Sequence, residues 1–134
     1  MIIIVLVLFL LDRIIKYYLV TSGGDYLINE GIALGILNEN AQLIFILHLF
    51  FTSLLAFYIL IKKVKFIEKL VISGIVVGSI SNLMDRVVYN GVVDYVKLWN
   101  LPVFNIGDSM VVVGVVSWIL LELYENYKKF NTGN

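Results

Sequence analysis

Two Asn-x-x-Asp pairs carry the residue types that could do chemistry in this chain. They are Asn82 with Asp85 and Asn105 with Asp108. Residues three apart share one face of a helix, so each pair presents an amide and a carboxyl together. When two carboxyls lie close to each other, one of them tends to keep its proton. The ionised member can then activate water while the protonated member polarises a carbonyl, which is acid–base hydrolysis without a metal.

Asp94 lies between the two pairs and supplies a third carboxyl. We prefer Asp94 and Asp108 as the catalytic pair, because a loop carboxyl that faces a carboxyl at a helix start leaves an open site. Asparagines beside them can orient the pair or hold the substrate backbone. Asp85 followed by Arg86 has the character of a structural ion pair at a helix end.

The elements that position these side chains are predicted to be membrane spans. Of the 134 residues 60% are apolar and 15% are charged, against about 25% charged in a typical soluble domain. Sixty per cent of the chain is about 80 residues, enough for four spans of about 20. This composition excludes a soluble globular domain and a disordered chain. Ten basic and ten acidic residues cancel, which leaves no charge pattern for binding nucleic acid.

Four apolar runs predict an all-α membrane protein, a bundle of four transmembrane helices in a single domain. They cover about residues 1–20, 41–61, 66–84 and 103–123. Helices are expected because each backbone polar group must find its partner within the span. The first run lacks a basic start and a small-residue cleavage site, so we expect it to be retained. It is short for a span, at roughly 18 to 20 residues, which suggests that a few residues precede it.

The basic residues predict the orientation of the bundle. They cluster around the link between the second and third runs and after the fourth run, at Lys62, Lys63, Lys65, Lys69, Lys128 and Lys129. The positive-inside rule places that link and both termini in the cytoplasm. The segments at about 21–40 and 86–102 are then outside. Asn90-Gly91 between β-branched residues predicts a hairpin turn, so a small β element and a loop are expected over the site.

Two other patterns predict structure rather than chemistry. Asp12 and Lys16 are four residues apart, and we expect them to form an ion pair on a helix surface. Gly74 and Gly78 form a small-xxx-small stripe, which predicts close packing of helices. With no cysteine and one histidine in the chain, no metal site and no cofactor are expected.

Five short motifs follow one another along nearly the whole chain. They are Asp12–Lys16 (D-x-x-[TS]-K, with Ile15 at the hydroxyl position), Asn29–Gly35 (N-x-G-x-x-[FL]-G), Gly78–Arg86 (G-x-x-G-N-x-x-D-R, with Ser81 for a glycine), Gly91–Tyr95 (G-x-V-x-D-[FY], with one residue dropped) and Phe104–Ser109 (F-N-x-A-D-S, with Gly107 for alanine). In this order on four spans they resemble the bacterial lipoprotein signal peptidases, the signal peptidase II family. The substitutions at Ser81 and Gly107 remove no group that does chemistry.

The resemblance implies roles for nine residues. Asp94 and Asp108 would be the catalytic aspartates of an aspartic endopeptidase. The implied substrate pocket is lined by Asn29, Arg86 and Asn105, and the implied supporting residues are Asp12, Lys16, Asn82 and Asp85. The resemblance places the enzyme in the bacterial cytoplasmic membrane, with its site near the outer face.

The resemblance also implies the partners. The substrate would be a diacylglyceryl-modified prolipoprotein, cut just before its lipidated cysteine, and globomycin-type peptide inhibitors would occupy the same cleft. Membrane lipid is the other expected partner, nucleic acid is not one, and the protein is expected to be a monomer.

A small proton-coupled four-span exporter is the alternative function. That function needs a carboxylate near the bilayer midplane, whereas Asp108 lies only a turn or two inside its predicted span, at about 1.5 Å per residue. A different intramembrane aspartyl protease is disfavoured, because Ile106-Gly107-Asp108 lacks the G-x-G-D spacing. A structural assembly factor would leave the clustered carboxyls unexplained.

Overall fold

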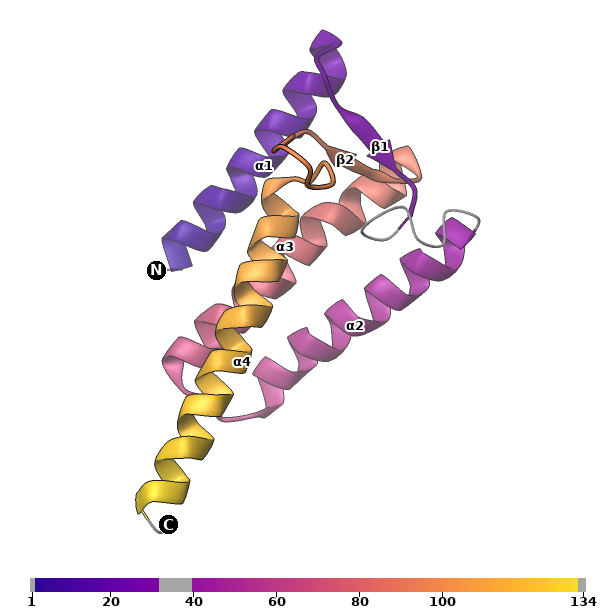
Figure 1. Ribbon diagram of the computed structural model, residues 1–134. Coiled ribbons are helices and arrows are strands. Elements are labelled where there is room, and N and C mark those ends of the chain that lie inside the picture. Colours follow the sequence, from indigo (N-terminus) through magenta and orange to yellow (C-terminus); the bar gives the residue numbers. More distant parts are fainter. Residues whose placement is uncertain (1, 32–39, 133–134) are drawn as a thin grey trace.

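The computed structural model describes residues 2–31 and 40–132. Within them it has α1 (Ile2–Ser22), β1 (Leu27–Asn29), α2 (Ala41–Ile61), α3 (Phe66–Tyr89), β2 (Val92–Asp94) and α4 (Ile106–Thr132). Helix α3 packs against α1, α2 and α4, and the two short strands lie at one end of the bundle (Figure 1). The predicted helical fold with a small β element is confirmed. Residues 32–35 of the second motif, and residues 32–39 of the predicted outer segment 21–40, lie outside the described residues.

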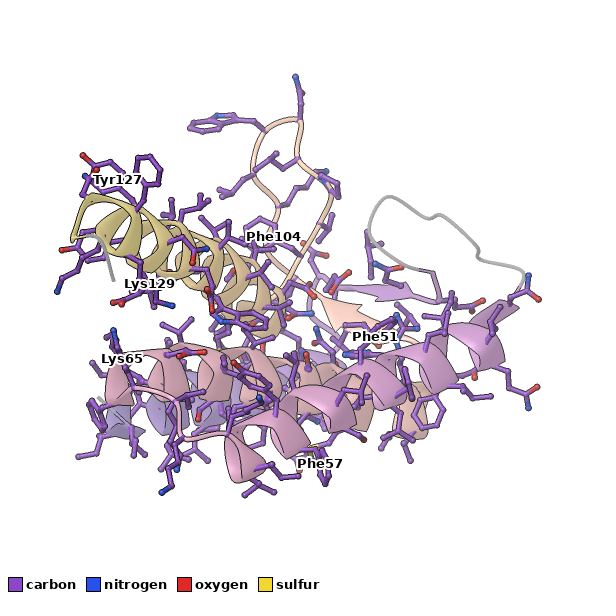
Figure 2. The ribbon with its side chains drawn as sticks, turned by 90° about the horizontal axis from the view of Figure 1, so that it is seen from below. Phe51, Phe57, Lys65, Phe104, Tyr127 and Lys129 are labelled. Atoms are coloured by element: carbon purple, nitrogen blue, oxygen red, sulfur yellow. The ribbon has the colours of Figure 1, made fainter. Side chains whose placement is uncertain are left out.

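The bundle exposes apolar side chains on its outside and buries several charged ones. Large apolar side chains on the helices are exposed, such as Leu60 at 80% and Phe57 at 61%, and Figure 2 shows Phe57 directed away from the bundle. Asp12, Lys16 and Asp85 are instead 0% exposed. This distribution is the reverse of that in a soluble domain and suits a bundle surrounded by lipid.

Three of the described helices, α2, α3 and α4, are long and apolar enough to cross a membrane. Helix α1 has 21 residues, but Asp12, Arg13 and Lys16 interrupt its apolar sequence. The bounds of α2 coincide with the predicted run 41–61. Helix α3 extends five residues beyond the predicted end at 84, whereas α4 begins three residues after the predicted start at 103 and ends beyond 123.

The hairpin predicted at Asn90-Gly91 is wrong. The residues before it belong to the last turn of α3, and Asn90 ends that helix in the left-handed conformation, with φ 58°. Its N–H donates to the carbonyl oxygen of Arg86 at 3.1 Å, a helix end at which asparagine is tolerated. The chain therefore leaves α3 directly into β2, which pairs antiparallel with the distant β1 and sets Leu27 opposite Asp94.

Helices α3 and α4 approach each other closely at Gly78. A Cβ at this position would lie 2.6 Å from the carbonyl oxygen of Gly107 and 2.9 Å from the Cβ of Met110. A Cβ on Gly74 would have no atom within 4 Å, so the close packing predicted there is wrong. The contact at Gly78 brings Asn82, one turn further along α3, beside the first turn of α4.

We expect Gly78→Ala to lower the melting temperature of the detergent-solubilised protein by several degrees, because overpacking of this kind costs about 1–3 kcal/mol. Gly74→Ala is the matched control. It should leave the melting temperature unchanged or raise it, since alanine favours a helix over glycine by up to about 1 kcal/mol. Equal losses in the two variants, measured by thermal unfolding, would contradict the close approach at Gly78.

Candidate active site

Asp94 and Asp108 come from different elements and are joined by Asn105. Asp94 is the last residue of β2, and Asp108 lies in the first turn of α4. The Nδ2 of Asn105 donates to Oδ1 of Asp94 at 2.7 Å. The Oδ1 of Asn105 accepts the backbone N–H of Asp108 at 2.8 Å. One side chain therefore fixes the distance between the strand and the helix that carry the two carboxyls.

The amino end of α4 is fully capped. Asn105 precedes the helix, and its own N–H donates to Oδ2 of Asp108 at 3.1 Å, which completes a reciprocal capping box. The two backbone amides between them donate, each at 3.3 Å, to the hydroxyl of Tyr95 and to Oδ1 of Asp12. The Asn105-x-x-Asp108 spacing therefore forms a helix cap, and the hydrogen bonds of this cap orient the Asp108 carboxyl.

Two more asparagines contact the carboxyl pair. Asn29, at the end of β1, donates to Oδ2 of Asp94 at 3.0 Å. Asn82 on α3 donates to Oδ1 of Asp108 at 2.7 Å and accepts from Nζ of Lys16 at 2.9 Å. Each carboxyl oxygen of the pair therefore accepts at least one N–H donor, and all three asparagines of the predicted site meet at it.

A buried cluster of charges lies beneath the pair. Lys16 contacts Asp12 at 2.9 Å and Asp85 at 2.7 Å, and Arg13 also pairs with Asp85. The expected Asp12–Lys16 ion pair exists, but it is buried rather than on the surface. The expected Asp85–Arg86 pair is wrong, because neighbouring helix residues point in different directions and Asp85 faces α1.

Arg86 holds the chain that follows β1. Its guanidinium donates to the carbonyl oxygens of Glu30 at 3.3 Å and Gly31 at 2.7 Å. Its buried Nε has no hydrogen-bond partner among the described residues. Arg86 also lines a cavity of about 180 Å³ between the amino end of α2 and the end of α3.

Three residues of the network were not assigned from the sequence. Ser81 donates to Oδ2 of Asp12, and Tyr95 donates to Oδ1 of Asp12 at 2.8 Å. Arg13 donates to the carbonyl oxygen of Ser81 at 3.1 Å as well as pairing with Asp85. The signal for Arg13 was available, since a charge in an apolar run needs a partner. No local pattern marks the two hydroxyls.

The environment of Asp94 favours its protonated form. Burial raises the pKa of the Asp94 carboxyl to about 6; the hydrogen bond from Asn29 opposes this rise, and the charge of Asp108 adds to it. Burial and the Asp12 carboxylate also raise the pKa of Tyr95, so its hydroxyl remains a donor. Within the described part of the chain, no three His, Asp or Glu side chains are grouped to hold a metal ion.

Comparison with known proteins gives a consistent result. A family model described as signal peptidase (SPase) II matches residues 4–124. Proteins named lipoprotein signal peptidase are 31% identical in Pelagibacter ubique (strain HTCC1062), over 98% of this chain and 92% of the relative, and 32% identical in Syntrophomonas wolfei, over 92% and 93%. A third, from Clostridium tetani, is 30% identical over 97% and 99%.

Solved structures share the fold. One described as a bacterial membrane enzyme matches with a TM-score of 0.86 and 26% identity, over 96% of this chain and 90% of the other. A second of the same description matches with a TM-score of 0.76 and 27% identity, over 91% and 90%.

Lys16→Met should strongly destabilise the protein, because it leaves the buried carboxylates of Asp12 and Asp85 without this cation, a loss of about 3–5 kcal/mol. Lys65→Met is the control. Lys65 pairs with Glu125 but is 64% exposed, and such pairs contribute at most about 1 kcal/mol. Thermal unfolding in detergent measures both variants, and a wild-type melting temperature for Lys16→Met would refute the role of the buried cluster.

The raised pKa of Asp94 predicts a pH-dependent stability difference. At pH values between the ordinary pKa of 3.8 and the raised pKa of about 6, Asp94 holds its proton in the folded protein and loses it in the unfolded chain. The free energy of unfolding therefore falls as pH rises through this window, by up to about 3 kcal/mol. The Asp94→Asn variant lacks this titrating group, so its stability does not change with the ionisation of residue 94. The melting temperature of the variant minus that of the wild type should therefore increase from pH 3.8 to about pH 6 and stay constant at higher pH. A difference that does not depend on pH would argue against a buried, titrating Asp94.

Proposed function

Because this chain belongs to the signal peptidase II family and therefore cleaves lipoprotein signal peptides, we propose that Asp94 and Asp108 perform the cleavage as an aspartic pair. The observation that carries the proposal is the bridge through Asn105, which bonds both residues. The substrate we propose is a diacylglyceryl-modified prolipoprotein, cut before its lipidated cysteine. The alternative function considered from the sequence was a proton-coupled exporter. Membership of the signal peptidase II family does not support it.

The surroundings of the two carboxyls suggest different roles. Asp94 has a pKa raised to about 6 and is the member we assign as the proton donor. Asp108 accepts the backbone N–H of Asn105 at the amino end of α4, and we assign it as the base. Asp108 would take a proton from water as the oxygen attacks the scissile carbonyl, while Asp94 protonates the carbonyl oxygen.

The second half of the reaction returns both groups to their starting states. The tetrahedral intermediate breaks its carbon–nitrogen bond as Asp108 passes its proton to the leaving amine. Asp94 recovers a proton from the hydroxyl of the intermediate, which becomes the new carboxylic acid. Asn29, which donates to Asp94, and Arg86, which lines the neighbouring cavity, are placed to contact the substrate backbone.

Charge balance supports a single proton on the pair. The buried cluster and the catalytic pair together hold four carboxyl groups, at Asp12, Asp85, Asp94 and Asp108. Arg13 and Lys16 supply two cations, and the partly buried Arg86 nearby supplies a third. Four minus three leaves one excess negative charge when every acid is ionised. Since an uncompensated buried charge is costly, one shared proton neutralises the cluster and gives an aspartic pair the state it needs.

We propose that α1 is the fourth span and that both termini are cytoplasmic. The three charged residues of α1 would be costly in lipid, but Asp12 and Lys16 are fully buried and paired, and Arg13 is paired with Asp85. The lysines between α2 and α3 favour a cytoplasmic link. The pair would then lie near the outer face of a bacterial cytoplasmic membrane, in a monomer whose cleft also accepts globomycin-type peptides.

We expect Asp94→Asn and Asp108→Asn each to lower cleavage of a diacylated prolipoprotein at least about a hundredfold, because acid–base catalysis contributes that much or more. Asp25→Asn is the matched control, an exposed aspartate beyond α1 that should retain full activity. Cleavage is measured by the mass change of the substrate, with and without its diacylglyceryl group. Full cleavage by either variant of the pair would rule out the assignment.

A further inference from the structure

The chain between Asp94 and Asp108 forms a loop that projects from the bundle. Val96 and Phe104 close its base, with Val96 N–H donating to the carbonyl oxygen of Phe104 at 2.7 Å and the reverse bond at 3.1 Å. Figure 2 shows the loop standing away from the helices, with Phe104 labelled at its base. Its outermost four residues, 98–101, are called the tip below.

The tip presents apolar side chains in a strained turn. Leu101 N–H donates to the carbonyl oxygen of Leu98 at 2.9 Å, which defines a β-turn with Trp99 as its first central residue. Trp99 has φ 41°, a conformation that such turns usually give to glycine. Trp99 is nevertheless 93% exposed, Leu101 58% and Leu98 44%. A strained backbone that exposes a tryptophan suggests a surface built to contact another molecule.

The position of the loop along α1 indicates which kind of molecule the tip contacts. Tyr95 and Gly107, at the two ends of the loop, both hydrogen-bond to Asp12 of α1. Helix α1 continues ten residues further, from Asp12 to Ser22, which is about 15 Å. Figure 1 likewise shows α1 running on past the loop. If α1 spans the membrane, as proposed above, the base of the loop lies below the outer surface of the bilayer.

The surface of α1 beside and beyond this level is also apolar and exposed. Ile14 is 61% exposed, Tyr17 69% and Tyr18 65%. We propose that the tip inserts into the outer leaflet and docks on phospholipid, continuing this lipid-facing surface. Tryptophan suits the boundary between headgroups and acyl chains, because its ring is apolar and its N–H can bond to polar groups. Lys97 beside the tip is exposed and can extend to the lipid phosphates.

The chain offers a direct test, because it has only two tryptophans. The Trp118→Phe variant leaves Trp99 as the sole reporter and keeps an aromatic ring against Tyr58. It would be reconstituted in vesicles of phosphatidylglycerol and phosphatidylethanolamine, with or without brominated acyl chains. We expect bromine to remove about half or more of the Trp99 emission and aqueous iodide to quench it little, as at a membrane boundary.

Replacing Leu98 and Leu101 by asparagine in the same background should reduce quenching by bromine and increase quenching by iodide. Trp99 emission that iodide quenches fully, with no effect of brominated lipid, would overturn the proposal. Bromine quenching that appears only after prolipoprotein is added would also overturn it and would make the tip a substrate contact.

The inference rests on the proposed membrane arrangement but fails separately from the proposed catalytic pair. Cleavage of diacylated prolipoprotein is measured on the same vesicles. Normal cleavage with a water-exposed Trp99 would reject lipid docking alone. A lipid-quenched Trp99 together with activity in Asp94→Asn or Asp108→Asn would reject the catalytic assignment alone.

Discussion

The capped amino end of α4 is the constraint on which the site depends. A helix begins with backbone amides that have no partner within the helix, and here the side chains of Tyr95, Asp12 and Asn105 supply those partners. Asn105 and Asp108 cap each other, and Asp12 reaches the same helix end from α1. Asn105 also donates a hydrogen bond to Asp94. The same side chain therefore caps the helix and brings the two carboxyls together. A shift of α4 would therefore separate the two aspartates.

The buried cluster explains why α1 must pack before the site is complete. Lys16 bonds to Asn82 on α3 as well as to two carboxylates, so it links the ionic cluster to the residue that holds Asp108. Removing α1 would leave Asp85 without either of its cations. Because unpaired charges are far more costly in lipid than in water, the bundle and the site are expected to form cooperatively.

Much of the arrangement follows from the sequence, and the departures have physical reasons. The helices are local patterns, so periodicity predicts them. The Asn105-x-x-Asp108 spacing was interpreted as one face of a helix, whereas Asn105 lies just before α4 and caps it. The predicted Asp85–Arg86 ion pair was wrong, because residues that are adjacent in a helix point in different directions. Asp85 pairs instead with Arg13 and Lys16. The Asn90-Gly91 turn was mistaken because burial of β2 against β1, a contact over some 65 residues, outweighs a local hairpin preference. The hydroxyls of Ser81 and Tyr95 act only through tertiary contacts that no spacing encodes.

The chemical division among the four carboxyls follows from their neighbours. Asp12 pairs with Lys16, and Asp85 pairs with both Lys16 and Arg13. In the described part of the chain, the hydrogen-bond partners of Asp94 and Asp108 are asparagine side chains and a backbone amide. Amides orient a carboxyl without adding a charge that would fix its ionisation. The same cluster can therefore lock two aspartates into structural pairs while leaving two free to exchange a proton, and the exchange is what hydrolysis requires.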